Sequence, residues 1–255
     1  HIYGLDVDPI EIVKTESRLR KLGYDESILT VCPVNFADID KVSEKYGKFD
    51  FILADLGVSS MQIDNPERGF SYKADGPLDL RLNPNKGVSA AERLKEITKD
   101  EFEGMLVENS DEPYAAEIAM AVFSKMKKGG RIEKTSDLRQ IIEDTLEFVP
   151  KAERKEAVKK SCMRVFQALR IDVNSEFEVL EQFMEKLPYV MNSGGRIAVL
   201  TFHSGEDKLV NRALKEGFRD GIYRAYSKDI VRPSAQECAQ NARAHSTKMR
   251  WAVRA

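Results

Sequence analysis

The chain has 255 residues, of which 42% are hydrophobic and 32% are charged, and its formal net charge at pH 7 is −2. This composition is ordinary for a globular protein, and the length fits one large domain or one domain with an insertion. The charge excludes a strongly basic protein, although a local basic patch is sufficient for binding nucleic acid.

Hydropathy, cysteine and histidine patterns exclude several other classes of protein. No stretch approaches the roughly 18 apolar residues that a membrane-spanning helix needs, and no signal peptide is visible. The three cysteines lie far apart and form no Cys-x-x-Cys pair, and the chain has only three histidines. We therefore predict a cytoplasmic protein with no disulfides, no metal site and no membrane contact.

The first part of the chain predicts strands that alternate with helices. The apolar segments Ile2–Asp6, Ile28–Cys32 and Phe51–Ala54 are typical of strands. Asp8 is placed to cap a helix that begins at Pro9 and continues to about Leu22. This alternation predicts parallel strands joined by helical crossovers.

A long, turn-rich segment follows the third predicted strand. It runs from Asp55 to about Pro84 and contains Gly57, Gly69 and Gly76. Connections inside compact domains usually have about 4–6 residues, and longer ones are often functional. Open α/β sheets bind their ligands beyond the carboxyl ends of the strands, so this segment begins where a ligand is expected.

From Gly87 to about Cys162 the sequence has a helical pattern. Ser89 with Glu92, and later Thr98 with Glu101, have the spacing of capping boxes. Apolar residues then recur every three or four positions, as in amphipathic helices. We predict a helical insertion at 87–162 that divides one α/β domain into two parts, 1–86 and 163–255.

The chain returns to the predicted sheet through a helix from Arg164 to about Leu187. Gln167, Arg170 and Asn174 lie on one side of this helix, beside its apolar stripe. Helical spacing alone favours a solvated flank for these three residues. A surface shaped for a ligand or an RNA is the alternative.

A further strand is predicted at Arg196–Thr201, after a turn at Gly194-Gly195. Ser204 follows its carboxyl end and is placed to cap the next helix, which makes a nucleophilic role less favoured. For His203 the sequence leaves two interpretations open, a structural histidine or one that contacts the substrate base or takes part in catalysis.

The last part of the chain predicts an antiparallel edge to the sheet, formed by Tyr223–Val231 and Met249–Val253. Between Asn241 and Arg254 there is no acidic residue, and the basic residues are Arg243, His245, Lys248, Arg250 and Arg254. These residues either contact RNA phosphates or discourage aggregation at the sheet edge.

Several blocks of the sequence closely resemble the MraW/RsmH-type family, whose members methylate N4 of a cytidine in small-subunit (16S) ribosomal RNA. The blocks are DLGVSSMQID and RGFSYKADGPLDLR within 55–81, FQALRIDVNSE at 166–176, GGRIAVLTFHSGED at 194–207 and NARAHSTKMR at 241–250. They occur in the family's order and extend over nearly the whole chain.

The resemblance implies a class I, Rossmann-like methyltransferase fold. This fold is an α/β sheet, mostly parallel with an antiparallel edge, and it is interrupted by a helical insertion domain that recognises the substrate. The resemblance also implies S-adenosyl-L-methionine as cofactor and 16S rRNA or the small ribosomal subunit as partner. A homodimer is compatible with the sequence.

The resemblance implies roles for individual residues. The positions that match the family's cofactor contacts are Asp6, Phe36, Asp55 and Gln62. The predicted catalytic residues are Asp55 and His203, and the predicted substrate-binding residues are Arg164, Gln167, Arg170, Asn174 and Ser204. From the residues alone, Asp6 is equally a solvated neighbour of the helix cap, Phe36 a core aromatic residue and Asp55 a turn cap.

The sequence also departs from the family pattern. The family has a glycine-rich block that this sequence does not contain, expected before His1, and its Leu-Glu-Asp-Arg after Phe-His-Ser is here Gly205–Lys208. These differences keep an alternative open, a non-catalytic or divergent RNA-binding or ribosome-assembly protein on the same scaffold. A dinucleotide oxidoreductase is a weaker rival, because the chain lacks the glycine fingerprint of that class.

Overall fold

The computed structural model describes residues 1 to 255, which form two compact units. The first, here the α/β unit, combines His1–Gly57 with Phe177–Ala255, and the second, the helical unit, is Val58–Glu176. The helical unit therefore includes the segments 58–86 and 163–176, which the sequence analysis assigned to the α/β domain.

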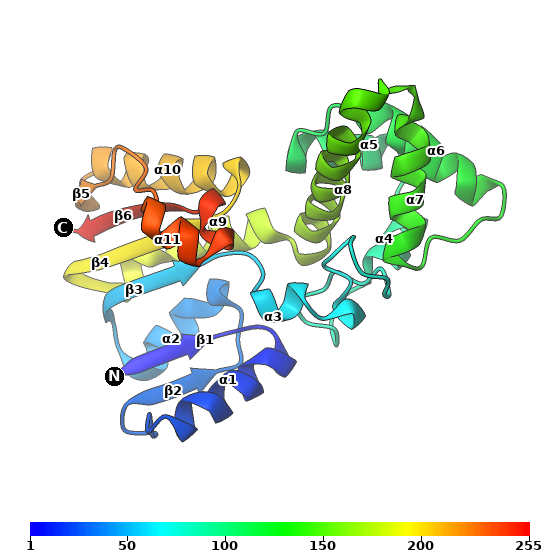
Figure 1. Ribbon diagram of the computed structural model, residues 1–255. Helices are drawn as coiled ribbons and strands as arrows, with labels where there is room; N and C mark the ends of the chain where they lie inside the picture. Colours follow the sequence, from blue (N-terminus) through cyan, green and yellow to red (C-terminus); the bar gives the residue numbers. More distant parts are fainter. The chain divides into compact units, whose positions relative to one another are not determined.

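The α/β unit contains two sheets (Figure 1). Its strands are β1 (Ile2–Leu5), β2 (Leu29–Cys32), β3 (Phe49–Asp55), β4 (Met191–Thr201), β5 (Tyr223–Tyr226) and β6 (Lys248–Arg254). β1 and β2 pair in parallel, and the other sheet has the order β3-β4-β6-β5. β3 and β4 are parallel, whereas β6 is antiparallel to both of its neighbours.

The predicted α/β class and the predicted antiparallel edge are confirmed. The predicted mostly parallel sheet is confirmed in part. The strands on either side of the helical segment, β3 and β4, are parallel neighbours in one sheet, whereas β1 and β2 form a separate sheet. β1 and β3 therefore each have one side without a neighbouring strand.

The helices of the α/β unit begin at well-defined caps. They are α1 (Pro9–Lys21), α2 (Ile39–Tyr46), α9 (Glu176–Val190), α10 (Ser204–Arg219) and α11 (Ala235–Gln240), with the short 3₁₀ helices η1 (Phe36–Asp38) and η4 (Ala242–Ser246). The carboxylate of Asp8 accepts hydrogen bonds from the backbone N–H groups of Ile10 and Glu11. The predicted cap and the proline at the first helical position are thus confirmed.

The core of the α/β unit lies on one face of the larger sheet. Buried side chains of α2, α9 and α10 pack there against strand residues such as Ile52, Ile197 and Ala252. Side chains alternate between the two faces of a strand. Phe51 and Leu53 consequently point the other way, and they are 60% and 58% exposed.

β4 begins five residues earlier than predicted, because the Gly194-Gly195 pair lies inside the strand as an irregularity of its pairing with β3. Gly194 has a φ of +79°. A Cβ atom on Gly195 would lie 2.8 Å from the carbonyl oxygen of Asn192. Both positions therefore require glycine, for conformation in one case and for space in the other.

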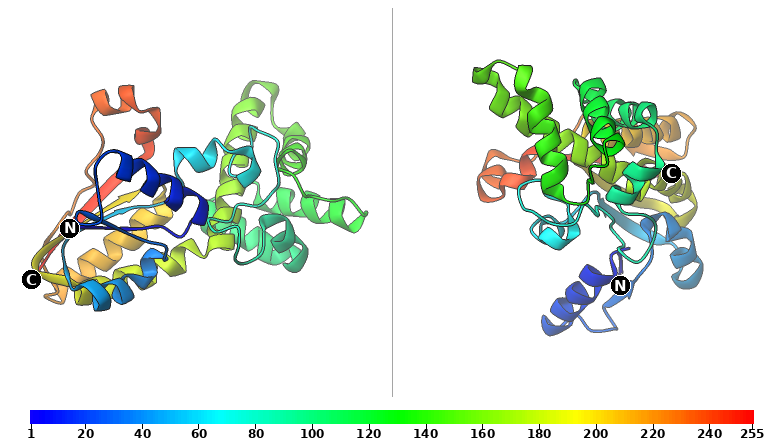
Figure 2. Two further views of the ribbon diagram at one scale, coloured as in Figure 1. Left: turned by 90° about the horizontal axis from the view of Figure 1, so that it is seen from below. Right: turned by 90° about the vertical axis from the view of Figure 1, so that its right-hand side faces the viewer.

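The helical unit consists of helices and short turns around its own core (Figures 1 and 2). Its elements are α3 (Ser60–Ile63), η2 (Pro66–Arg68), α4 (Ala90–Glu96), α5 (Lys99–Ser110), α6 (Ala115–Lys127), α7 (Thr135–Thr145), η3 (Leu146–Phe148) and α8 (Lys151–Asn174). Both predicted capping boxes are present, at Ser89 with Glu92 and at Thr98 with Glu101. No helix of the protein is both long and apolar enough to cross a membrane.

The predicted single helix from Arg164 to Leu187 is wrong. The chain instead forms α8 and α9, which are separated at Ser175 by a left-handed backbone conformation with a φ of +48°. The last side chain of α8, Asn174, is bonded to the segment around Leu80, far away in sequence. A tertiary contact of this kind overrides the helical periodicity that spans both helices.

Candidate active site

Two carboxylates lie at the carboxyl ends of strands in the α/β unit. Asp55 is the last residue of β3 and stands opposite Leu200 of the parallel strand β4. Asp6 directly follows β1, and its N–H donates to the carbonyl oxygen of Cys32 at the end of β2. Both residues are exposed. The carboxyl ends of the strands, where they lie, are the location at which open α/β sheets bind ligands.

The electrostatic environment of Asp55 suits proton transfer. Partial loss of hydration, and then the negative charge of Glu206, raise the pKa of Asp55 above its ordinary value of 3.8. Glu206 is itself buried. A carboxylate with a raised pKa is a stronger base than an ordinary one.

The pKa of Asp6 is raised as well. Desolvation is the main cause, and it outweighs the hydrogen bond that Asp6 accepts from the N–H of Asp8. The nearby charges of Asp8 and Glu11 act in the same direction as desolvation. A ligand that donates hydrogen bonds, such as a ribose with its two hydroxyl groups, would replace the lost hydration.

His203 is the N-cap of α10, which corrects the prediction that Ser204 caps this helix. Nδ1 of His203 lies 3.5 Å from the backbone nitrogen of Glu206, and Nε2 lies 3.3 Å from Oε1 of the same residue. The other carboxylate oxygen of Glu206 accepts from the N–H of Phe202 at 2.8 Å. Both ring nitrogens of His203 therefore face Glu206, while Ser204 is exposed in the first turn.

Gly205, one of the departures from the family pattern, has a physical explanation. A Cβ atom built on it would lie 2.6 Å from Cζ of Phe177 and 3.2 Å from Nδ1 of His203. The ring of Phe177 also packs edge-on against the ring of His203, with 5.7 Å between centroids. Phe177 thus occupies the space that a larger residue at 205 would need.

Phe36 and Gln62 lie in different units. Phe36 is half-buried in η1 and meets the ring of Phe183 edge-on at 5.2 Å. Gln62, in the helical unit, is buried, and its Oε1 accepts from the N–H of Ser59 at 2.7 Å in a capping box. The side chain of Gln62 thus shapes the start of the predicted ligand-binding segment.

The predicted substrate-binding residues of α8 differ in how they are used. Arg170 forms a two-point ion pair with Glu176, and Gln167 donates to the carbonyl oxygen of Asn109. Arg164 is half-buried and makes no hydrogen bond or ion pair within the chain. Among these three residues, Arg164 is the one whose charge is open to a ligand.

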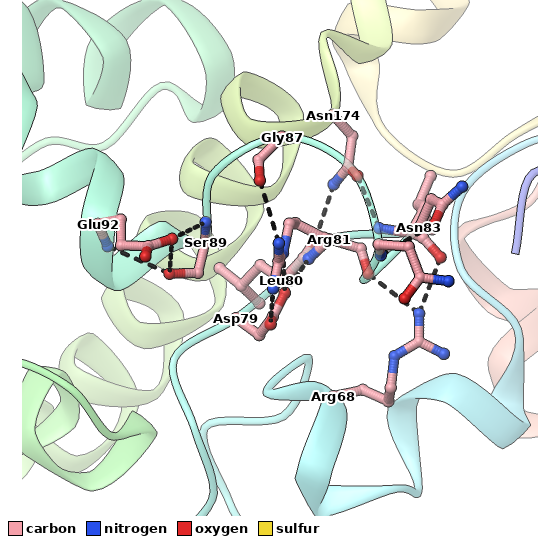
Figure 3. Close-up of polar contacts among 11 residues, drawn as sticks. Arg68, Asp79, Leu80, Arg81, Asn83, Gly87, Ser89, Glu92 and Asn174 are labelled. Atoms are coloured by element: carbon pink, nitrogen blue, oxygen red, sulfur yellow. Dashed lines mark hydrogen bonds and ion pairs between the residues drawn. The ribbon is translucent and has the colours of Figure 1, made fainter. Parts of the chain in front are cut away.

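Asn174 holds a strap that we define as residues 79–82 (Figure 3). Its Nδ2 donates to the carbonyl oxygen of Leu80 at 2.7 Å, and its Oδ1 accepts from the N–H of Leu82 at 2.7 Å. The buried guanidinium of Arg68 donates to the carbonyl oxygens of Arg81 and Leu82 at 3.0 and 2.9 Å. Two side chains thus satisfy the backbone of the strap.

The strap contains a strained residue. Leu80 is buried and has a φ of +64°, in the left-handed region that disfavours residues with a Cβ atom. Such a conformation costs about 1–3 kcal/mol and persists where surrounding contacts fix it. Neither the strap nor the buried ion pair of Asp207 with Arg250 was predicted, because neither leaves a local signal in the sequence. In this ion pair Nε of Arg250 lies 2.8 Å from Oδ1 of Asp207.

Comparison with known proteins identifies the family of the chain. The sequence profile of the MraW methylase family matches residues 1–255. A protein of Agathobacter rectalis named ribosomal RNA small subunit methyltransferase H 1 is 65% identical over the whole chain, which covers 73% of that relative's length. A protein of the same name from Lachnoclostridium phytofermentans is 62% identical, with 70% of its length covered.

A third relative, ribosomal RNA small subunit methyltransferase H 2 of Alkaliphilus metalliredigens, is 56% identical over the whole chain, which covers 73% of its length. The range matched by the family profile includes both the α/β unit and the helical unit. The chain belongs to the MraW methylase family.

Proposed function

We propose that the protein transfers a methyl group from S-adenosyl-L-methionine to N4 of a cytidine in 16S rRNA of the small ribosomal subunit. Family membership and the names of the relatives support this proposal. The observation that carries the chemistry is the exposed carboxylate of Asp55 at the end of β3, with a raised pKa. A cytoplasmic location follows from the ribosomal substrate.

The residues of the α/β unit fit the proposed cofactor. Asp6 offers an exposed carboxylate to ribose hydroxyls, and Phe36 offers part of its ring to an adenine. The sulfonium of the bound cofactor supplies an activated methyl group. Gln62 remains a predicted cofactor contact. Its buried side chain completes a capping box with Ser59, which would fix the backbone at the start of the predicted ligand-binding segment.

In the proposed reaction Asp55 accepts the proton of the amine. The lone pair of N4 is delocalised into the cytosine ring, so a hydrogen bond to Asp55 helps to localise it. As N4 bonds to the methyl carbon, the bond from that carbon to the sulfonium sulfur would break, its electron pair would stay on sulfur to give a neutral thioether as leaving group, and N4 would lose a proton to the Asp55 carboxylate. Glu206 strengthens this base, because its charge contributes to the raised pKa of Asp55.

His203 is the weaker candidate of the two predicted catalytic residues, since its ring nitrogens face Glu206. We propose that it positions Glu206, whose charge in turn contributes to the raised pKa of Asp55. The helical unit is proposed to recognise the RNA, with the cytidine turned out of its stack so that N4 is accessible. Arg164 is the α8 residue best suited to contact the RNA, because its charge has no partner within the chain.

Substitution of Asp55 by alanine tests the proposed function. We expect the full-length variant to lose roughly 10²–10⁴-fold in kcat, the usual contribution of a general base. Asp55 is exposed, so circular dichroism should show the variant folded like the parent protein, with a melting temperature that is no lower. The measurement is transfer of labelled methyl groups to small ribosomal subunits that lack the modification.

The same assay separates the rival functions. Unchanged transfer by the Asp55→Ala variant would reject the role of Asp55. A parent protein that binds the subunit but transfers no label would instead support the non-catalytic RNA-binding alternative. Calorimetric titration with S-adenosyl-L-methionine and with NAD distinguishes a methyltransferase from an oxidoreductase.

A further inference from the structure

The turn between α6 and α7, at the right-hand edge of Figure 1, carries a cluster of unpaired positive charges. The cluster consists of Lys125, Lys127, Lys128 and Arg131, and none of the four forms an ion pair within the chain. The one acidic residue from 125 to 134 is Glu133, which lies 3.9 Å from Lys95. The excess of positive charge at this turn is therefore not neutralised by the protein.

The backbone of the turn is held in one shape. The N–H of Gly129 donates to the carbonyl oxygen of Met126, and that of Gly130 donates to Lys125, both at 2.9 Å. Gly129 has a φ of +82°. A Cβ atom on Gly130 would lie 2.6 Å from Cγ of Lys125, so the lysine chain lies directly across this glycine. The backbone that carries the four cations is thus fixed by its own hydrogen bonds and by the two glycines.

A hollow of about 460 Å³ lies beside the turn. Ala91, Met126 and Ile132 supply its apolar lining, and its charged lining consists of Lys95, Arg131 and Glu133. Glu133 lies 3.9 Å from Lys95, so Arg131 is the cation of this lining without an ion pair. The hollow therefore offers apolar surface to the ring of a nucleotide and the charge of Arg131 to a neighbouring phosphate.

Stabilisation of α6 explains only part of the cluster. Lysines in the last turn of a helix interact favourably with its dipole, and this applies to Lys125 and Lys127. Lys128 and Arg131 lie beyond the end of the helix. Some lysines elsewhere in the unit are paired, as Lys159 and Lys160 are with Glu156. Others are not, among them Lys73, Lys86, Lys151 and Lys155. What distinguishes the turn is that four unpaired cations lie within the segment 125–131.

We propose that the turn at 125–131 contacts the phosphate backbone of the substrate RNA, and that the adjacent hollow receives a nucleotide next to those phosphates. This proposal rests on the proposed function and adds a defined surface to it. The contact is independent of base sequence, because a lysine or arginine that neutralises a phosphate carries no base information.

The test compares two matched double variants, Lys127→Gln with Lys128→Gln, and Lys159→Gln with Lys160→Gln. Both remove two positive charges from exposed positions of the helical unit. We expect the first to weaken binding of a labelled 16S rRNA fragment roughly tenfold at low salt and to reduce the slope of log K against log salt by about 1–2. The second should change both quantities much less.

Kinetics supply the second measurement. The KM for small subunits should rise in the Lys127/Lys128 variant while kcat stays near the parent value, because the turn does not touch the reacting atoms. Equal affinity and salt slope in the parent and this variant would overturn the proposal, and so would equal losses in the two variants. Failure of the parent protein to methylate would reject the proposed function instead, and the binding data would still decide the role of this surface.

Discussion

At the residue scale, Asp55 illustrates how a functional position reduces stability. Its pKa is raised in the folded protein by desolvation and by Glu206, so the folded state binds the proton of this carboxyl more tightly than the unfolded state does. Stability is therefore lost as the pH rises from the ordinary pKa of 3.8 through the raised value. The penalty is therefore present at pH values above the raised pKa.

Substitution of Asp55 by asparagine should consequently raise the melting temperature at about pH 7. The gain should disappear as the pH falls below the ordinary pKa, where the parent carboxyl is neutral in both states. Thermal melts followed by circular dichroism between about pH 3 and pH 7 measure the effect. Asp229→Asn, at an exposed residue with no hydrogen bond or ion pair, is the control. A gain that does not vary with pH would contradict the explanation.

The sequence was informative at residues whose role is local. The caps at Asp8, Ser89 and Thr98 follow from hydrogen bonds between near neighbours, and the structure has all three. His203 replaced Ser204 as the cap of α10 because a ring nitrogen and Glu206 together complete the capping box. Histidine is not among the usual N-cap residues, so the pattern favoured the serine.

At the scale of elements, contacts between distant segments determined where α8 ends, which the helical periodicity of the sequence did not show. Asn174 connects the end of α8 to the strap through Leu80 and Leu82, which are 94 and 92 residues away in the chain. Sequence spacing on α8 alone placed Asn174 on a solvated or substrate-binding side. The structure gives it two hydrogen bonds to the strap, and a single sequence contains no signal for such a pairing.

Removal of the Asn174 side chain should loosen the strap. Asn174→Ala leaves the carbonyl of Leu80 and the N–H of Leu82 without these partners, and we expect a loss of about 1–3 kcal/mol in the free energy of unfolding. The amide of Leu82 should exchange its hydrogen faster. Native-state hydrogen exchange, together with denaturant unfolding, measures both effects.

Two further substitutions give this experiment its controls. Asn174→Asp keeps the oxygen that accepts from Leu82 and removes the donor to Leu80, so protection of the Leu82 amide should be retained. Gln167→Ala, on the same helix as Asn174, removes a hydrogen bond to the carbonyl oxygen of Asn109 in α5 and should leave Leu82 protected. Equal exchange rates at Leu82 in Asn174→Ala and in the parent would show that the strap does not depend on Asn174.

At the scale of the whole molecule, the alternation of strands and helices was sufficient to predict an α/β class, and the two extended segments near the end of the chain predicted its antiparallel edge. The limits of the units were harder to predict. Segment 58–86 contains little regular structure, but its buried Leu78 and Leu80 belong to the core of the helical unit. A turn-rich composition does not reveal which of two hydrophobic cores will receive its few apolar side chains.

The unpaired sides of β1 and β3 have a consequence for the behaviour of this chain in concentrated solution. A strand that lacks a neighbour is a template for a strand of another molecule. In β3 the exposed apolar side chains of Phe51 and Leu53 favour such association further. We expect the 255-residue chain to self-associate, with sedimentation coefficients that rise with concentration. Leu53→Lys should suppress this rise, whereas Leu22→Lys, at a similarly exposed leucine beyond α1, should not. A chain that stays monomeric at all concentrations would mean that the open edges are harmless in water.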